Sequence, residues 1–289
     1  MQRTLRLGGQ SFAPEELIVM AIVNRTPDSF FDRGATYAAD AALRAVEQAV
    51  AEGARIIDIG GVKAGPGADV GPAEEIRRTV ATIAAVRAAF PDVVISIDTW
   101  RAEVAVEAVA AGADLLNDTW SGADPALAQV AADTGTGLVC SHAGGLAPRT
   151  RPHRAGFDDV VADVVSTVTG LADRAVALGV RPDGILIDPA HDFGKNTRHS
   201  LETTRRLDEL AATGWPVLVA LSNKDFVGET LDLPVDERLE GTLAATVVSA
   251  WLGARVFRAH QVRQTRRALD MVASIRGDRA PTVSRRGLA

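Results

Sequence analysis

The feature that most constrains the fold of this chain is an eightfold alternation of short apolar runs with long, alanine-rich amphipathic stretches. The runs are nearly continuously apolar and rich in β-branched residues, which is typical of parallel strands buried on both faces. The expected strands cover residues 17–23, 55–59, 93–97, 114–116, 137–140, 184–187, 216–221 and 254–257. The expected helices cover residues 39–52, 72–89, 101–111, 125–133, 158–178, 200–212, 240–253 and 264–275.

Strands that alternate with helices indicate right-handed βαβ units and a parallel sheet. Eight such units in 289 residues match the size of one closed (β/α)8 TIM barrel, of the α/β class. A doubly wound open sheet is the alternative, but it needs a glycine-rich phosphate loop after the first strand. That strand instead runs into Asn24-Arg25-Thr26-Pro27, which favours the barrel. We expect one domain over residues 1–276 and a polar tail over residues 277–289.

Composition limits the partners and the location of the protein. The net charge of -6 and the pI near 5.4 give no support for a surface that binds nucleic acid or anionic membranes. No apolar run is long enough to span a membrane, and the first residues lack the apolar core of a signal peptide. The single cysteine, Cys140, excludes a disulfide framework and a cysteine-cluster metal site. We therefore expect a soluble, cytoplasmic protein with neither nucleic acid nor membrane as a partner.

Polar side chains follow almost every expected strand, at the barrel end that carries active sites in this fold. The chain has 31 basic residues, yet its lysines are only Lys63, Lys195 and Lys224, and all three follow expected strands. One such residue alone is more often a helix cap or a surface charge, but eight strand ends together indicate a functional face. The polar strand-end residues are Asn24, Asp58, Asp98, Asn117, Asp118, His142, Asp188, Ser222, Lys224, Arg258 and His260.

Two groups of these side chains point to different chemistry. The first group offers two carboxylates, an amide and an ammonium: Asp98, Asn117, Asp188 and Lys224. It suits a flat, nitrogen-rich heterocycle, because carboxylates accept from ring N–H and amino groups and lysine donates to carbonyl or ring nitrogen. The second group is Arg258 and His260, with Asn24 across the barrel, and it suits a phosphate-type anion or a hydrated Mg²⁺.

An ordered series of motifs runs through residues 20–262 of the chain. They read AIVNRTPDSF at 21–30, IIDIGG at 56–61, SIDT at 96–99, ND at 117–118, DP at 188–189, FGK at 193–195, S-x-K at 222–224 and R-x-H at 258–260. Each string alone is weak evidence, but the ordered set closely resembles dihydropteroate synthases. That resemblance implies a TIM barrel, usually a homodimer, that works with Mg²⁺ in the folate pathway. Such enzymes join 6-hydroxymethyl-7,8-dihydropterin pyrophosphate to p-aminobenzoate and release pyrophosphate.

The resemblance also implies roles for individual residues of this chain. The substrate-binding residues for the pterin ester are Asp98, Asn117, Asp188, Lys224 and Arg258. The catalytic residues are Arg258, His260 and Lys224, and Asn24 is on the metal side of the pyrophosphate. This assignment agrees with the chemistry of the two groups of strand-end side chains.

The half of the site for the second substrate departs from the family pattern. Where the family reads Glu-Ser-Thr-Arg-Pro-Gly, this chain has VKAGPG at 62–67. Ala64 therefore replaces the threonine of the aminobenzoate pocket, and Gly65 replaces the arginine that orders the catalytic loops. Asp225 replaces the serine that receives the aminobenzoate carboxylate, which a like charge repels. These changes predict weak or absent synthase activity with p-aminobenzoate.

The altered positions also suggest a rebuilt pocket. Near them, Arg25, Phe31 and Arg33 differ from the usual first loop, and we expect Asp225 to face Lys63 and these two arginines. One alternative function is a non-catalytic protein that binds a pterin or a sulfonamide-like ligand, and a second is transfer to a different amine acceptor. A methyl-folate partner of corrinoid enzymes is a third, disfavoured by the R-x-H pair and by the lack of a corrinoid-binding region.

Overall fold

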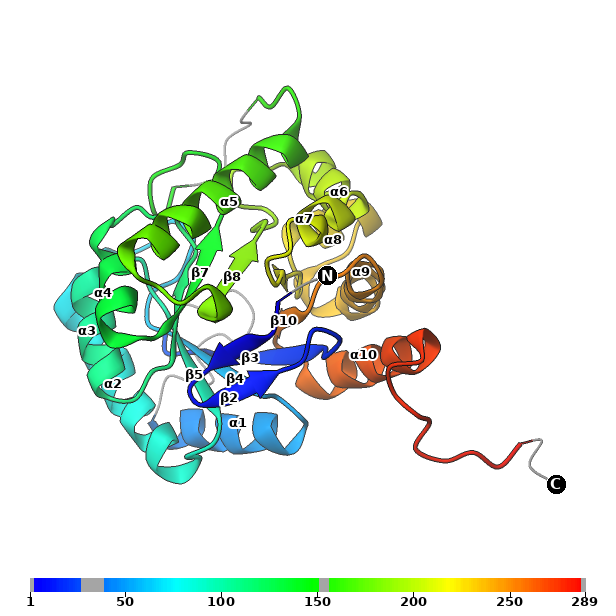
Figure 1. Cartoon of the computed structure of the whole chain (residues 1–289), viewed down its shortest axis with the longest axis horizontal. Coiled ribbons are helices and arrows are strands. Elements are labelled where there is room, and N and C mark those ends of the chain that lie inside the picture. The colour runs from blue at the N-terminus through cyan, green and yellow to red at the C-terminus, as the bar shows by residue number, and fades with distance from the viewer. Residues whose placement is uncertain (1–2, 27–38, 151–155, 287–289) are drawn as a thin grey trace.

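The computed structural model, which describes residues 3–26, 39–150 and 156–286, contains eight parallel strands that form a barrel (Figure 1). They are β3 (Ile18–Asn24), β4 (Ile56–Gly60), β5 (Val94–Asp98), β6 (Leu115–Asp118), β7 (Gly137–Ser141), β8 (Ile185–Asp188), β9 (Leu218–Ala220) and β10 (Val256–Ala259). Their order in the sheet is β8-β7-β6-β5-β4-β3-β10-β9. A parallel bridge between Ile187 and Val217 joins the two edges, so the predicted TIM barrel is confirmed.

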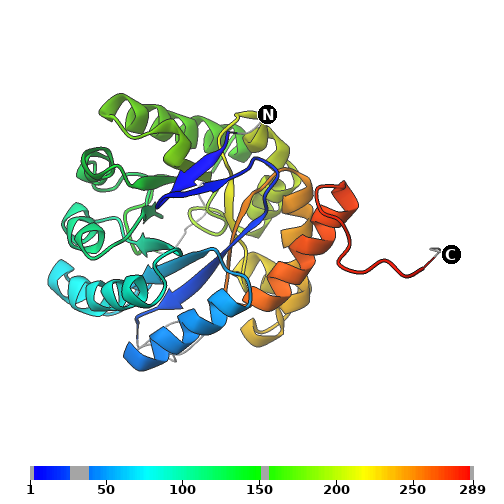
Figure 2. The same ribbon diagram turned by 60° about the horizontal axis from the view of Figure 1, so that its bottom comes forward.

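Helices surround the strands, as Figures 1 and 2 show from two directions. They are α1 (Ala39–Ala51), α2 (Pro72–Ala89), α3 (Ala102–Ala110), α4 (Ala126–Thr134), α5 (Val160–Leu178), α6 (Thr197–Arg205), α7 (Leu207–Ala212), α8 (Asp225–Leu231), α9 (Leu239–Trp251) and α10 (Val262–Arg276). Two short 3₁₀ turns, η1 (Pro182–Gly184) and η2 (Val235–Glu237), precede β8 and α9. Beyond α10 the described part of the tail extends away from the barrel. None of the helices in the described ranges is long and apolar enough to cross a membrane.

Local signals fix where the helices begin and end. The side chain of Asp159 caps α5 by accepting from the backbone N–H groups of Val161 (2.9 Å) and Ala162 (3.0 Å). Gly179 ends that helix at a φ of 108°, which a residue without a Cβ adopts without strain. At the start of α2, Pro72 takes a first-turn position where no N–H is needed.

The predicted boundaries are close to those of the structure, with three differences. The helix expected over residues 200–212 is two helices, because the backbone at Arg206 leaves the helical region (φ -108°, ψ 28°). Helix α8 lies between β9 and α9, where we expected no helix. An additional antiparallel hairpin, β1 (Leu5–Leu7) with β2 (Gln10–Phe12), precedes the barrel.

The barrel has two apolar cores. The larger one lies between the sheet and the helices. The smaller one joins Leu5, Leu7 and Phe12 of the hairpin to buried side chains of all eight barrel strands, two from β3 and one from each of the others. Arg255, just before β10, fastens the hairpin, since its guanidinium donates to the carbonyl of Phe12 in β2 at 3.3 Å and to that of Arg3 at 2.6 Å. The hairpin therefore covers the N-terminal end of the barrel, and the opposite end is available for a site.

Candidate active site

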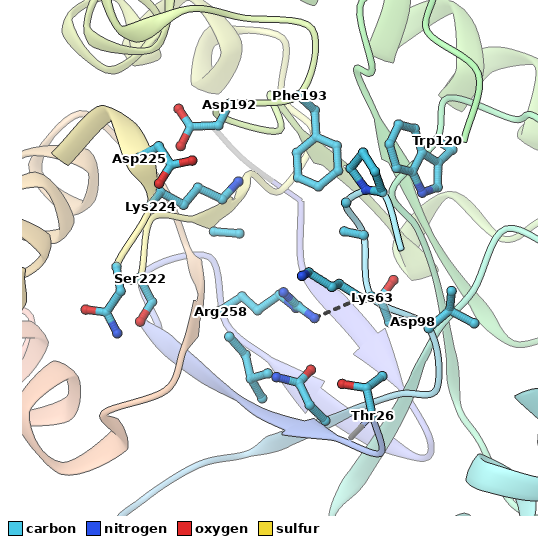
Figure 3. A pocket seen from close by; sticks show the side chains of 18 of the residues that line it. Thr26, Lys63, Asp98, Trp120, Asp192, Phe193, Ser222, Lys224, Asp225 and Arg258 are labelled. Carbon is cyan, nitrogen blue, oxygen red and sulfur yellow. Dashed lines mark hydrogen bonds and ion pairs between the residues drawn. The ribbon is translucent and has the colours of Figure 1, made fainter. Parts of the chain in front are cut away.

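A cavity of about 480 Å³ opens at the C-terminal ends of the strands (Figure 3). Most of the predicted site residues line it. They come both from the half that matches the family pattern and from the half that departs from it. They are Asn24, Lys63, Ala64, Gly65, Asp98, Lys224, Asp225, Arg258 and His260. The structure thus brings together residues that lie up to 236 positions apart between Asn24 and His260.

Arg258 on β10 lies at the floor of the cavity between two carboxylates. Its Nε donates to Asp58 Oδ2 at 2.6 Å, and its Nη2 donates to Asp98 Oδ2 at 2.7 Å. Burial alone lowers the pKa of Arg258, but the charges of Asp58 and Asp98 outweigh it and raise that pKa. Burial raises the pKa of Asp98, against the opposing charge of Arg258. The floor is therefore a preassembled ion-pair network of one guanidinium and two carboxylates.

Asp58 is the centre of this network and was not among the predicted site residues. It is fully buried on β4 and accepts from Ser96 Oγ at 2.6 Å and from Asn117 Nδ2 at 3.2 Å. These bonds orient both the Asn117 amide and the Arg258 guanidinium. The signal was present in the sequence, since Asp58 is a strand-end carboxylate, but its partners are 38 or more positions away.

Asn117 and Asp188 are buried at the ends of β6 and β8. They are not among the described residues that line the cavity. The side-chain NH2 group of Asn117 donates to Asp58, so the side-chain oxygen of Asn117 is the atom that can accept from a ligand. The carboxylate of Asp188 accepts from the backbone N–H of Ala190 at 2.7 Å. Burial raises the pKa of Asp188, and the nearby charge of Lys224 opposes this. Both residues lie at the predicted end of the barrel.

Aromatic side chains form one wall of the cavity. Trp120 and Phe193 pack edge to face with ring centroids 5.2 Å apart, and both line the cavity. The ammonium of Lys224 lies 4.9 Å from the Phe193 ring and donates to the carbonyl of His191. Burial lowers the pKa of Lys224, opposed by the carboxylates of Asp192 and Asp188. An aromatic wall beside a cation suits a flat ring with a hydrogen-bond acceptor.

His260 lies beside Ser222 at the ends of β10 and β9. Its Nδ1 is 2.9 Å from Ser222 Oγ. Burial lowers the pKa of His260 to about 3, and the charge of Arg258 adds to that effect. The imidazole is therefore neutral near pH 7, so it can take part in hydrogen bonds but supplies no positive charge.

In the altered half of the site Lys63 supplies a cation, but two of the changed positions supply no polar group. Ala64 and Gly65 line the cavity without any polar side-chain atom. Asp225 starts α8, is 82% exposed, and pairs with Arg238 at 2.9 Å. Its expected position opposite Arg25 is wrong, because Arg25 is buried and donates to the carbonyl of Arg78 at 3.1 Å. Phe31 and Arg33 lie outside the described residues.

The loop after β8 supplies a lining residue that sequence reasoning missed. Ala190 and Asp192 have positive φ angles of 48° and 69°, which non-glycine residues rarely adopt. The Asp192 carboxylate stabilises this loop by accepting from Ser200 Oγ (3.0 Å) and from the backbone N–H of Phe226 (3.2 Å). Asp192 therefore links the β8 loop to α8 at the edge of the cavity.

Lys195 joins the loops that follow β7 and β8 beneath the cavity. Its ammonium is 2.6 Å from His142 Nδ1 and 3.1 Å from the carbonyl oxygen of Phe193. Since Lys195 donates to Nδ1, His142 carries its proton on Nε2 and donates to Asp163 at 2.7 Å. Burial lowers the pKa of Lys195 to about 7, opposed by the charge of Asp188. Lys195 and His142 are buried and Asp163 is exposed, and the bond from Lys195 to the carbonyl of Phe193 helps to hold Phe193 in the cavity wall.

Replacing Lys195 with Met is expected to lower the free energy of unfolding by about 2–4 kcal/mol, because several buried acceptors lose their donor. The loss should grow as the pH rises from 7 towards 10, by at most about 1.4 kcal/mol per pH unit. In that range the unfolded chain keeps the Lys195 proton and the folded chain releases it, so stability of the wild type rises with pH. Urea unfolding at several pH values measures this difference. A difference for Lys195→Met that stays flat over this range would contradict the account.

Comparisons with known proteins agree with this geometry. A family model described as pterin binding enzyme matches residues 20–260. A Mycobacterium leprae protein named inactive dihydropteroate synthase 2 is 59% identical over 287 residues, which cover 98% of this chain and 99% of that protein. The Bacillus subtilis dihydropteroate synthase is 38% identical, over 89% of this chain and 88% of that one. The Yersinia pestis dihydropteroate synthase, solved with a sulfonamide drug, has a TM-score of 0.90 at 34% identity and covers 96% of this chain and 100% of that one. The chain therefore belongs to the dihydropteroate synthase family.

Proposed function

We propose that this protein binds a pterin ester but makes dihydropteroate from p-aminobenzoate slowly or not at all. The observation that carries the proposal is the contrast between the two halves of one cavity. The half with Arg258, Asp98 and Lys224 is preassembled, while Ala64 and Gly65 offer the acceptor no polar side chain. The 59% identity to a protein named inactive dihydropteroate synthase 2 supports the same conclusion.

The pterin ring would use the strand-end groups and the aromatic wall. The carboxylates of Asp98 and Asp188 and the amide oxygen of Asn117 accept from amino and ring N–H groups. Lys224 donates to a ring carbonyl or ring nitrogen, and Trp120 and Phe193 close off water. The Asp58 network holds these groups in place, since it fixes the amide of Asn117 by hydrogen bonds of 3.2 and 3.3 Å.

The diphosphate of the ester would lie near Arg258, His260 and Asn24, with Mg²⁺. A Cβ placed on Gly60 would be 3.8 Å from Asn24 Oδ1 and 3.7 Å from Asp98 Oδ2, so Gly60 leaves space between two oxygen donors. One or two protein oxygens completed by phosphates and waters is a usual Mg²⁺ environment. When bound, Mg²⁺ supplies positive charge that makes pyrophosphate a better leaving group. Arg258 would supply a guanidinium to the diphosphate oxygens, and neutral His260 would supply a hydrogen bond.

The acceptor half argues against p-aminobenzoate as the native partner. Asp225 places a carboxylate at the cavity where an incoming carboxylate would lie, and Arg238 neutralises it only in part at the exposed surface. Two functions are compatible with this arrangement. The protein either binds the pterin ligand without chemistry or transfers it to an amine that carries no carboxylate. Titration of the wild type with dihydropterin pyrophosphate and Mg²⁺, with and without candidate amines, tests both functions. If the ester does not bind, both are refuted.

We also propose that the protein is a homodimer in the cytoplasm. Apolar side chains are exposed on the adjacent helices α9 and α10, where Trp251 is 60% and Met271 and Ile275 are 61% exposed. Arg276 donates to the carbonyl of Ala250 at 3.4 Å, which brings the ends of the two helices together. A second copy of the chain would cover this patch. A chain with one cysteine has no need of an oxidising compartment.

A charge in this patch is expected to separate the dimer. Trp251→Glu should sediment as a monomer, because a buried carboxylate at the interface has no partner. Val106→Glu on α3, where Val106 is 50% exposed, is the matched control and should remain dimeric. Sedimentation velocity at several concentrations measures both variants, and a dimeric Trp251→Glu protein would place the interface elsewhere.

A further inference from the structure

Lys63 is a cation that lines the cavity without a hydrogen-bond or ion-pair partner among the described residues. It lies in the loop between β4 and α2 and lines the cavity. Figure 3 shows its amine pointing into the cavity, which Arg258 also lines. Within residues 3–26, 39–150 and 156–286, Arg258 pairs with Asp58 and Asp98, whereas Lys63 has no hydrogen bond or ion pair.

The guanidinium of Arg258 is paired with the carboxylates of Asp58 and Asp98, whereas the ammonium of Lys63 pairs with no carboxylate of the described residues. Both cations line one partly enclosed cavity, where an anion that enters is attracted more strongly than it would be in water. Lysine can supply such an anion with up to three N–H donors. The arrangement therefore favours a ligand with several oxygen atoms and negative charge at this point.

Gly65 explains how Lys63 comes to occupy this space. A Cβ placed on Gly65 would lie 3.9 Å from Lys63 Cε, an ordinary contact distance. The alkyl chain of Lys63 thus runs past the place from which a side chain at position 65 would project. A cation from position 63 therefore reaches the region that a side chain at position 65 would otherwise enter.

We propose that Lys63 binds the diphosphate of the pterin ester, as a specificity-determining residue of this chain. This inference rests on the proposed function, because it assumes that the cavity takes a pterin ester. A lysine is a point charge without the paired donors of a guanidinium, so it attracts phosphate oxygens but orders them less. Lys63 thereby retains affinity for the ester while the loop loses the geometric control that the transfer step needs.

Calorimetric titration of Lys63→Gln with four ligands tests the proposal. The ligands are dihydropterin pyrophosphate, 6-hydroxymethyl-7,8-dihydropterin without the diphosphate, inorganic pyrophosphate and p-aminobenzoate. We expect the affinity for the two diphosphate ligands to fall about tenfold to a hundredfold, and that for the uncharged pterin to change less than about twofold. Lys63→Arg should keep most of the affinity. Arg44→Gln, which removes an exposed charge on α1, should change nothing.

Each other outcome has a distinct meaning. Unchanged ester binding by Lys63→Gln overturns the inference while leaving the proposed function intact. An equal loss for the uncharged pterin also overturns it, since the effect would then be on the pocket as a whole. A loss confined to p-aminobenzoate would assign Lys63 to an acceptor carboxylate instead. If the wild type binds neither pterin, the proposed function fails and the inference fails with it.

Discussion

Replacing Arg258 with Met is expected to weaken binding of the pterin ester about 100-fold or more and to destabilise the fold by about 3 kcal/mol. The substitution removes a donor for the phosphates and leaves the fully buried Asp58 without its ion-pair partner. It also leaves Asp98 without the ion pair that opposes the effect of burial on its pKa. Removing one member of a buried pair costs more than the pair itself contributes.

The destabilisation should depend on pH in a defined direction. Burial already raises the pKa of Asp98 above its ordinary value, and loss of Arg258 would raise it further. A carboxyl group with a raised pKa in the folded state costs stability as the pH rises above its unfolded value. The difference from the wild type should therefore be larger at pH 8 than at pH 5, as measured by urea unfolding. Arg258→Lys keeps the charge and is the control; equal stability of Arg258→Met and the wild type at pH 8 would contradict the network.

Restoring the family residues at the altered positions is expected to increase dihydropteroate formation about 100-fold or more. The variant combines Ala64→Thr, Gly65→Arg and Asp225→Ser. It returns a hydroxyl to the pocket, a guanidinium near the departing charge, and a neutral donor where Asp225 now repels a carboxylate. Product formation at saturating pterin ester and p-aminobenzoate, with Mg²⁺, measures the gain.

The structure leaves room for all three changes. Gly65 does not have a positive φ, and its Cβ position is 3.9 Å from the nearest side-chain atom, in Lys63. Ala64 and Asp225 are exposed, so only the surface pair with Arg238 is lost. The free energy of unfolding should change by less than about 1 kcal/mol. A folded triple variant that binds the ester and still gives no gain in product would mean that other positions are responsible for low activity.

The sequence predicted the fold best where burial determines which residue types can occur. Strands such as β3 are covered on both faces, so they read as continuous apolar runs, and their polar ends mark the functional face. Hairpin β1–β2 was missed because three-residue strands are too short to show a period. Helix α8 was missed because it begins at Asp225, directly after the strand-end motif.

Pairing within the site could not be predicted for a different physical reason. Sequence motifs identify which residues face the cavity, whereas partners are chosen by rotamer and burial in the folded state. Asp225 selects Arg238 rather than Arg25, and Asp58 collects Ser96, Asn117 and Arg258 from three other strands. The link from Lys195 through His142 to Asp163 is likewise visible only in three dimensions.

The central claim is that the pterin half of the cavity works while the acceptor half does not. It is tested most directly by measuring ester binding and dihydropteroate formation on one preparation of the wild type, with Mg²⁺ and p-aminobenzoate. The Bacillus subtilis dihydropteroate synthase is the reference for turnover. We expect saturable binding of dihydropterin pyrophosphate, and product formation at least about 1,000-fold slower than the reference, from the lost loop cation and the repelling carboxylate together. Turnover at the rate of the reference would contradict the account.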